Sequence, residues 1–136
     1  MYKELEKIFR TLLSEVYKNV MKPNGYKRDG QNFRQIMHEG SISKGMIVNF
    51  QRSMGCRDEE LIFTINVAKL KVIDPDQVDP KFKEYDCELL NRKRPQHLCG
   101  KYIIDQWWYI TPETDYGSLK AEIEEYLADY AIPWLR

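Results

Sequence analysis

The stretch LIFTINVAK, residues 61–69, decides the fold of this sequence. It has the strongest β-propensity in the chain, and successive side chains of a strand point to opposite faces of a sheet. One set of alternate positions is apolar from Leu61 to Val67, whereas the other set includes Thr64 and Asn66. The stretch therefore predicts a strand with one apolar side and one partly polar side.

Two earlier segments, residues 32–38 and 45–52, show the same alternation and are joined by short connections. We expect the three segments to form an antiparallel meander whose apolar sides share one face. Unpaired amides in an apolar interior cost about 1–3 kcal/mol each, so the opposite face is not expected to be fully buried. This second face is called the polar face, and its residues on the three strands are Arg34, Asn49, Gln51, Thr64 and Asn66.

Amphipathic helices are expected at both ends of the chain. Apolar residues recur at three- and four-residue steps from Leu5 to Val20, and Pro23, Asn24 and Gly25 would end this helix. Near the C-terminus, Ser118 would cap a helix that Pro133 ends. The apolar stripe of that second helix consists of Leu119, Ile123, Tyr126, Leu127 and Tyr130.

Between the meander and the last helix, the pattern is less regular. Asp79 as a cap and Pro80 at a first helical position predict a short helix, although residues 82–92 fit a strand as well. Residues 105–111, DQWWYIT, predict a further strand. The sequence thus predicts an α+β fold, a single domain over residues 1–136. A largely antiparallel sheet of about four to five strands is packed by the N- and C-terminal helices.

Composition limits the class of protein. Lys and Arg number 21, as do Asp and Glu, and a zero net charge counts against a dedicated nucleic-acid binder. No apolar run is long enough for a membrane span, and the N-terminus does not resemble a signal peptide. Three cysteines without a CxxC spacing indicate reduced thiols, so we expect a cytoplasmic protein.

Trp107 and Trp108 are neighbours, so on a strand their indoles point to opposite faces. Trp108 shares its parity with Ile110, which assigns Trp108 to the core. Trp107 and Tyr109 are then expected on the same side as the polar face. A one-residue slip of the register would exchange the two indoles.

The polar face, extended by these two aromatic residues, is a candidate ligand-binding surface. Aromatic rings supply flat contact area, and carboxamides supply paired donors and acceptors. The alternative is that the segment after residue 78 covers this face and that its backbone satisfies the amides. The candidate ligand-binding residues are Arg34, Asn49, Gln51, Thr64, Asn66, Trp107 and Tyr109.

The densest cationic run, NRKRPQHLCGK at residues 91–101, is a second candidate, for binding an anion. The alternative is a solvated loop. Another basic run lies at residues 25–34, and convergence of the two runs would strengthen the case for an anion site. The candidate anion-binding residues are Arg92, Lys93, Arg94, His97 and Lys101.

No catalytic constellation is recognisable. Nucleotide-binding and hydrolase motifs are absent from the sequence, and His38 and His97 have no neighbours at metal-ligand spacing. We expect no metal and no cofactor. The favoured hypothesis is a non-enzymatic binding domain for a protein partner, for example in an immunity role. The alternatives are a small-ligand or enzymatic domain using the polar face, and a phosphate or nucleic-acid contact through residues 91–101.

Four motifs stand in a recognisable order before a helix ending in AIPWL. They are GYKRDGQNFR (25–34), IVNFQRS (47–53), FTINVA (63–68) and DQWWYI (105–110). Together they resemble a bacterial family catalogued as domain of unknown function 4304, although NRKRPQHL (91–98) matches the family pattern only loosely. The resemblance implies a compact bacterial cytoplasmic domain, and it implies no activity and no catalytic residues.

Overall fold

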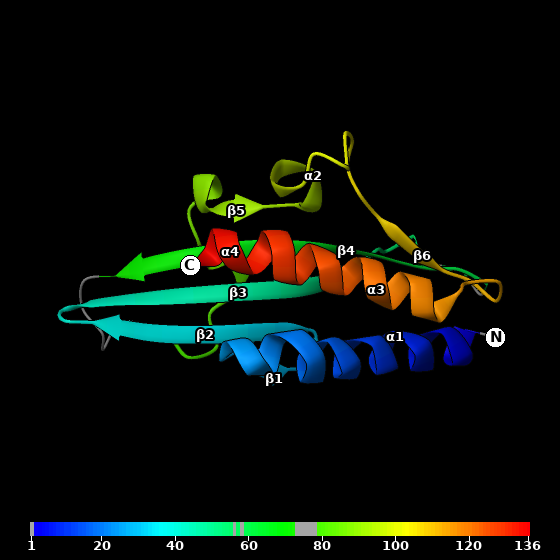
Figure 1. The fold of residues 1–136 in the computed structure, drawn as a ribbon, viewed down its shortest axis with the longest axis horizontal. Coiled ribbons are helices and arrows are strands. Elements are labelled where there is room, and N and C mark those ends of the chain that lie inside the picture. The colour runs from blue at the N-terminus through cyan, green and yellow to red at the C-terminus, as the bar shows by residue number, and fades with distance from the viewer. Residues whose placement is uncertain (1, 56, 58, 73–78) are drawn as a thin grey trace.

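In the computed structural model, two long helices lie on one face of an antiparallel sheet (Figure 1). The structure describes residues 2–55, 57, 59–72 and 79–136. Within these residues, the strands are β1 (Lys27–Asp29), β2 (Asn32–Glu39), β3 (Ile42–Arg52), β4 (Leu61–Val72), β5 (Arg92–Lys93) and β6 (Trp108–Ile110). The predicted α+β class is confirmed.

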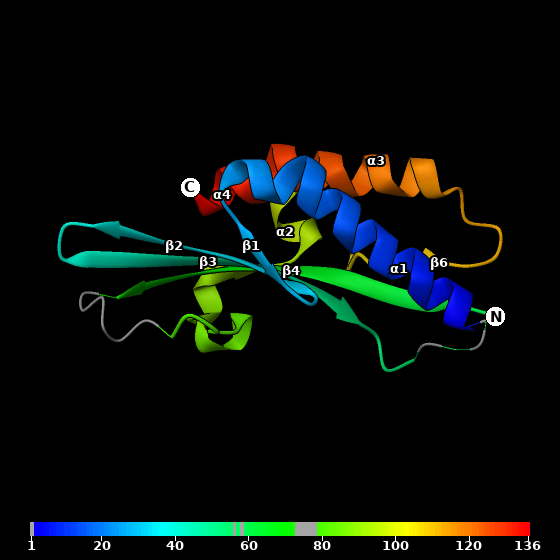
Figure 2. The ribbon, with the colours of Figure 1, turned by 90° about the horizontal axis from the view of Figure 1, so that it is seen from below.

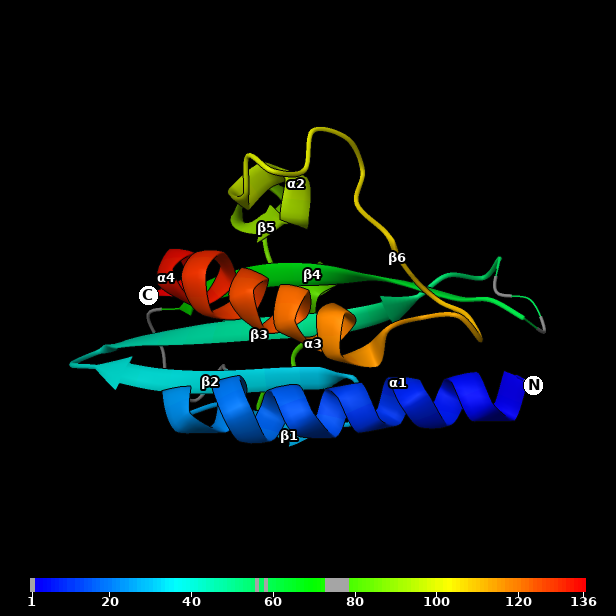
Figure 3. The same cartoon turned by 45° about the vertical axis from the view of Figure 1, so that its right-hand side comes forward.

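The sheet has the order β1-β2-β3-β4, and both β5 and β6 pair with β4 along its remaining edge. The predicted antiparallel meander of β2, β3 and β4 is confirmed. On the shared edge of β4, Phe63 is opposite Trp108 and Val67 is opposite Lys93. The chain between β5 and β6 contains a short helix, α2 (Pro95–Leu98), and arches away from the sheet (Figure 3).

The N-terminal helix consists of α1 (Tyr2–Val16), a π-helical turn η1 (Tyr17–Met21) and a 3-10 turn η2 (Lys22–Asn24). It ends at Gly25, whose φ of 91° is readily adopted only by glycine. The C-terminal helix consists of α3 (Tyr116–Tyr126), a π-helical turn η6 (Leu127–Ala131) and α4 (Ile132–Leu135). The N-terminal helix thus ends at Gly25, where the sequence predicts its end.

Two expectations about the C-terminal helix were wrong. Its cap is Asp115, which accepts a hydrogen bond from the backbone N–H of Ser118 at 3.3 Å. Pro133 does not end the helix but lies in the first turn of α4, where a missing N–H is tolerated. In the π-helical turn just before it, the N–H of Ile132 reaches back five residues to the carbonyl of Leu127, so the helix continues past the proline.

The main core fills the space between the helices and the apolar face of the sheet. Phe63 stacks on Phe50 at 5.8 Å and on Trp108 at 5.7 Å, measured between ring centroids. Trp108 is only 4% exposed, and its indole N–H donates to Glu122 on α3. The assignment of Trp108 to the core is confirmed.

The segment after residue 78 covers part of the other face (Figure 2). It contains two 3-10 turns, η4 (Glu84–Asp86) and η5 (Leu89–Asn91), so the expected short helix beginning at Pro80 was wrong. Asp79 instead accepts from the backbone N–H of Lys81 in a turn, and this bond does not continue into a helix. A second, smaller core is formed here by Ile47, Ala68, Phe82 and Cys87.

Gly45 on β3 makes this covering possible. A Cβ added to Gly45 would lie 2.9 Å from Cζ of Phe82, closer than two carbon atoms pack. The absence of a side chain at this strand position therefore lets the Phe82 ring lie against the sheet.

Cys87 and Cys99 are buried free thiols, and Cys56 lies outside the described residues. Burial raises the pKa of the Cys87 thiol to about 11, so this thiol is protonated near neutral pH. In the described part of the chain, no helix has the length and apolar character needed to cross a membrane.

Candidate functional site

Asparagines from three neighbouring strands form a ladder across the polar face. Asn32, Asn49 and Asn66 are directly opposite one another in the register of β2, β3 and β4. Asn66 Nδ2 donates to Asn49 Oδ1 at 3.1 Å, and Asn49 Nδ2 donates to Asn32 Oδ1 at 2.8 Å. Asn66 Nδ2 also donates to Gln51 Oε1 at 2.7 Å. The amides of the polar face therefore largely satisfy one another.

Two of the predicted ligand-binding residues, Arg34 and Thr64, are buried and donate to backbone carbonyls of other segments. Arg34 is 7% exposed, and its Nε donates to the carbonyl of Phe82 at 2.7 Å while its Nη1 contacts Asp29 at 3.1 Å. Thr64 is fully buried, and its hydroxyl donates to the carbonyl of Gln106 at 2.7 Å. In this part of the polar face, backbone carbonyls of the covering segments accept from Arg34 and Thr64, whereas the alternative expectation was that the covering backbone would satisfy the amides.

Beside the ladder, the polar face stays open at the edge of β4. A cavity of about 320 Å³ lies there, and we call it the amide–arginine pocket. It brings together residues of the polar face and of the basic run, which are far apart in the sequence. Its lining consists of Gln51, Asn66, Glu84, Tyr85, Arg92, Lys93, Arg94 and His97.

Within the described residues, the two carboxamides of the pocket each keep one polar atom without a hydrogen bond. Asn66 donates through its Nδ2, and Gln51 accepts through its Oε1. Among the described residues, no hydrogen bond reaches Asn66 Oδ1 or starts from Gln51 Nε2. The floor of the pocket thus offers one acceptor and one donor side by side.

Arg92, on β5, forms one wall of the pocket. Its Nε donates to the carbonyl of Cys87 at 2.8 Å, and its Nη2 donates to the carbonyl of Tyr85 at 3.0 Å. These two bonds fix the guanidinium against the covering segment. Both acceptors are backbone carbonyls and not carboxylates, so the bonds hold the positive charge in place without neutralising it.

Arg94 and His97 form the opposite rim through a reciprocal pair of bonds. The backbone N–H of Arg94 donates to Nδ1 of His97 at 3.1 Å, and the backbone N–H of His97 donates to the carbonyl of Arg94 at 2.9 Å. Because Nδ1 is an acceptor here, a neutral His97 ring carries its proton on Nε2. His97 therefore also presents a donor.

Trp107 supports this rim and does not enter the core. The guanidinium of Arg94 lies over its indole at 5.3 Å from the ring centroid. Asp105 joins the two side chains, since it accepts from Trp107 Nε1 at 2.9 Å and contacts Arg94 Nη1 at 3.5 Å. The expected strand 105–111 is shorter than predicted, and Trp107 lies just before β6.

Other predicted residues lie elsewhere. Lys101 pairs with Glu122 on α3 at 3.2 Å, and Tyr109 is 55% exposed, opposite Ile62. Neither lines the pocket. The basic run at residues 25–34 belongs partly to β1, at the opposite edge of the sheet from β5, so the two basic runs do not converge.

Glu84 and Tyr85 line the pocket but were not among the predicted residues. The only signal for them was their position in the segment expected to cover the polar face. In the described residues, no group of three or more His, Cys, Asp or Glu side chains is arranged to hold a metal ion.

A family model described as Domain of unknown function (DUF4304) matches residues 17–136. The chain belongs to the DUF4304 family. The DUF4304 match spans the whole sheet, the pocket and the C-terminal helix, and it begins directly after α1. No curated protein and no solved structure matches the chain. Membership in DUF4304 assigns no activity, so the pocket has to be interpreted from its own chemistry.

Proposed function

We propose that this protein is a non-enzymatic binding domain that holds an acidic peptide segment of a partner protein in the amide–arginine pocket. The observation that carries this proposal is the convergence of Gln51 and Asn66 with the Arg92–Arg94 side chains around one cavity. A surface that combines fixed cations with free carboxamide groups matches a ligand that has both carboxylate and amide groups.

The cations of the pocket favour a carboxylate. Arg92 and Arg94 outnumber Glu84, the one acidic residue among the lining residues. A guanidinium presents a planar fork that pairs with a carboxylate through two hydrogen bonds. An Asp or Glu side chain of the partner would therefore pair with Arg94 and lie near the charge of Arg92, whose Nε and Nη2 already donate to backbone carbonyls.

The remaining polar groups favour a peptide over a phosphate. Asn66 Oδ1 and the Glu84 carboxylate are acceptors, and a fully charged phosphate has no N–H to donate to them. A peptide backbone has both a donor and an acceptor, so it would satisfy Asn66 Oδ1 and Gln51 Nε2 together. The exposed ring of Tyr85, 64% accessible, adds flat apolar area at the rim.

A small carboxylated metabolite is the second candidate ligand. The cavity volume of about 320 Å³ is at the lower end of the range typical of small-molecule sites. Such a ligand would use the same arginines, so the two candidates are separated by whether a free carboxylate compound displaces a bound peptide.

Selection of random displayed peptides on the protein tests the proposal. We expect enrichment of Asp and Glu, and loss of binding when the acidic residue of a selected peptide is replaced by its amide. Arg94→Gln should weaken the synthetic peptide about tenfold or more, because a charged contact is lost. Lys101→Gln removes one charge from the same basic run outside the pocket and serves as the matched control. Equal weakening by both variants would show that the pocket is not the binding site.

A further inference from the structure

Three lysines lie on the helix side of the sheet, outside the amide–arginine pocket. Lys44 on β3 is directly opposite Lys71 on β4. Lys69 is two residues before Lys71 on the same strand, so its side chain projects from the same face. We call Lys44, Lys69 and Lys71 the lysine face.

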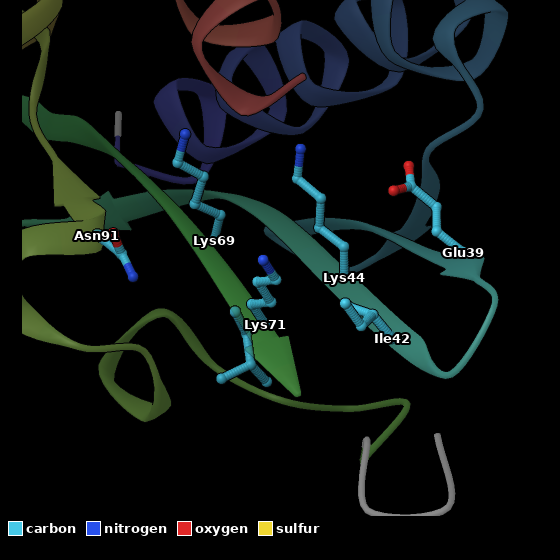
Figure 4. A pocket seen from close by; sticks show the side chains of 7 residues that line it. Glu39, Ile42, Lys44, Lys69, Lys71 and Asn91 are labelled. Carbon is cyan, nitrogen blue, oxygen red and sulfur yellow. The ribbon is translucent and has the colours of Figure 1, made fainter. Parts of the chain in front are cut away.

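The lysine face lies at the end of the sheet that the helices leave uncovered. Strands β2, β3 and β4 extend beyond the end of α4 in Figure 1. A cavity of about 340 Å³ is found here, lined by the lysine face together with Glu39 and Asn91 (Figure 4). Figure 4 shows Lys44 and Lys69 rising from neighbouring strands toward the same side as the helices.

This arrangement gathers like charges that nothing in the described chain neutralises. Lysines directly opposite each other on neighbouring strands repel and destabilise the pair. No carboxylate of the described residues forms an ion pair with any of the three lysines. Glu39 is the one acidic residue among those lining the cavity, so positive charge is in excess.

Lys69 is held in a fixed position at the inner end of the cavity. Its Nζ donates to the carbonyl of Trp134 at 2.9 Å and lies 4.1 Å from the centroid of the Trp134 ring. Burial, and then the charges of Lys44 and Lys93, hold the pKa of Lys69 below its ordinary value. A nearby anion would relieve this repulsion. The carbonyl at the end of α4 explains the placement of Lys69, but it does not explain Lys44 and Lys71.

We propose that the lysine face binds a terminal, multiply charged phosphate group. Ammonium groups of Lys44, Lys69 and Lys71 supply point charges around one cavity, and the Asn91 amide at its wall can donate to a phosphate oxygen. In contrast to the amide–arginine pocket, the lysine face has no guanidinium fork for a carboxylate. The two proposals rest on different residues and stand or fall separately.

Calorimetric titration with inorganic pyrophosphate at low ionic strength tests the proposal. We expect binding that weakens steeply as salt is added, because the contacts are between opposite charges that salt screens. The double substitution Lys44→Gln with Lys71→Gln should reduce the affinity at least tenfold. The melting temperature of this double variant should be no lower than that of the native protein, because the substitutions remove a repulsive pair. The melting curve also shows whether the variant is folded.

Lys3→Gln with Lys7→Gln is the matched control, since it removes the same charge from the exposed side of α1. The control should keep the affinity within about twofold, whereas equal losses in both double variants would overturn the proposal. Lys69 contacts the ring of Trp134, so the tryptophan emission of the protein should also change on titration. In the last titration, the ligand is a short single-stranded oligonucleotide without terminal phosphates. Binding of this oligonucleotide in the absence of pyrophosphate binding would assign the surface to a polymer backbone and overturn the proposal.

Discussion

The guanidinium of Arg94 lies over the indole of Trp107, 5.3 Å from the ring centroid, and Asp105 contacts both side chains. A half-buried tryptophan next to a sheet suggests a surface for direct recognition. Here its face is already covered by an arginine of the same chain. The indole therefore contributes to binding indirectly, by holding the Arg94 charge at the rim of the amide–arginine pocket.

Trp107→Ala should weaken the selected acidic peptide about two- to fivefold, because an exposed cation–π contact contributes about 0.5–1 kcal/mol. The free energy of unfolding should change little, since Trp107 lies outside the core. Tyr109→Ala removes a neighbouring aromatic ring that does not line the pocket. Peptide titration and urea unfolding of both variants check this, and a similar loss of affinity in Tyr109→Ala would contradict it.

Asn49→Ala should lower the free energy of unfolding by about 1–2 kcal/mol, because it removes two hydrogen bonds of the half-buried ladder, one to Asn32 and one from Asn66. Asn32→Ala removes the last member of the ladder and breaks only one of these bonds. Urea unfolding at neutral pH should therefore rank Asn49→Ala as the more costly change. The ladder would have no cooperative role if the two substitutions cost the same.

Gly45→Ala should destabilise the protein by about 1–3 kcal/mol, since the new methyl group overlaps the Phe82 ring. Moving Phe82 also displaces the carbonyl that accepts from Arg34. Gly100→Ala is the control, because an added Cβ there meets nothing within 4 Å. Thermal unfolding of the two variants makes the comparison, and equal melting temperatures would mean that Phe82 does not pack on the strand.

Glu15 joins the two long helices, because it accepts from Lys120 Nζ at 2.9 Å and from Tyr116 Oη at 2.8 Å. The bond from Lys120, followed by that from Tyr116, holds the pKa of Glu15 below its ordinary value of 4.5. The ionised Glu15 therefore stabilises the fold above pH 4.5, and this contribution is lost as the pH falls through the lowered pKa.

Glu15→Gln should therefore melt below the native protein at pH 7, and the difference should shrink as the pH is lowered below about 4. Melting curves across this range measure the effect. Glu113→Gln, in an exposed loop, should show no comparable pH-dependent difference. A gap between Glu15→Gln and the native protein that stays constant with pH would contradict the assignment.

Side-chain parity made the two faces of the sheet predictable from the sequence. Phe63 and Asn66 are three residues apart and must face opposite ways, and Trp108 follows the parity of Ile110. Burial of an entire apolar face leaves little freedom in such an assignment, because a slip by one residue would bury amides and expose phenylalanine.

The contacts between distant segments were not predictable. Asn32, Asn49 and Asn66 form a ladder only because the turns of the meander set their register, and turn geometry is not fixed by alternation. Likewise, the basic run meets the polar face because β5 pairs with Val67 and Ala68 on β4. The lysine face was missed for the same reason, since Lys44 is distant in sequence from Lys69 and Lys71.

The wrong predictions of where helices begin are explained by residues close to each position. Asp115 and Ser118 are both good caps, and the chain uses the earlier one, which gives the helix an extra turn. Pro80 was expected to start a helix, but the following residues turn so that Phe82 reaches the small second core instead. Burial of one aromatic ring thus outweighed the local helix signal in this segment.

β5 consists of two residues and pairs with only two positions of β4, whereas β3 and β4 are paired over ten positions. Both β5 and β6 depend on the same edge of β4, and the chain between them arches away from it. Sub-global opening is cheapest where few contacts must break. Amide hydrogen exchange should therefore be faster in β5 than in the central strands. An occupied pocket should slow this exchange, so protection at the backbone of Arg92 and Lys93 would report occupancy without an attached probe.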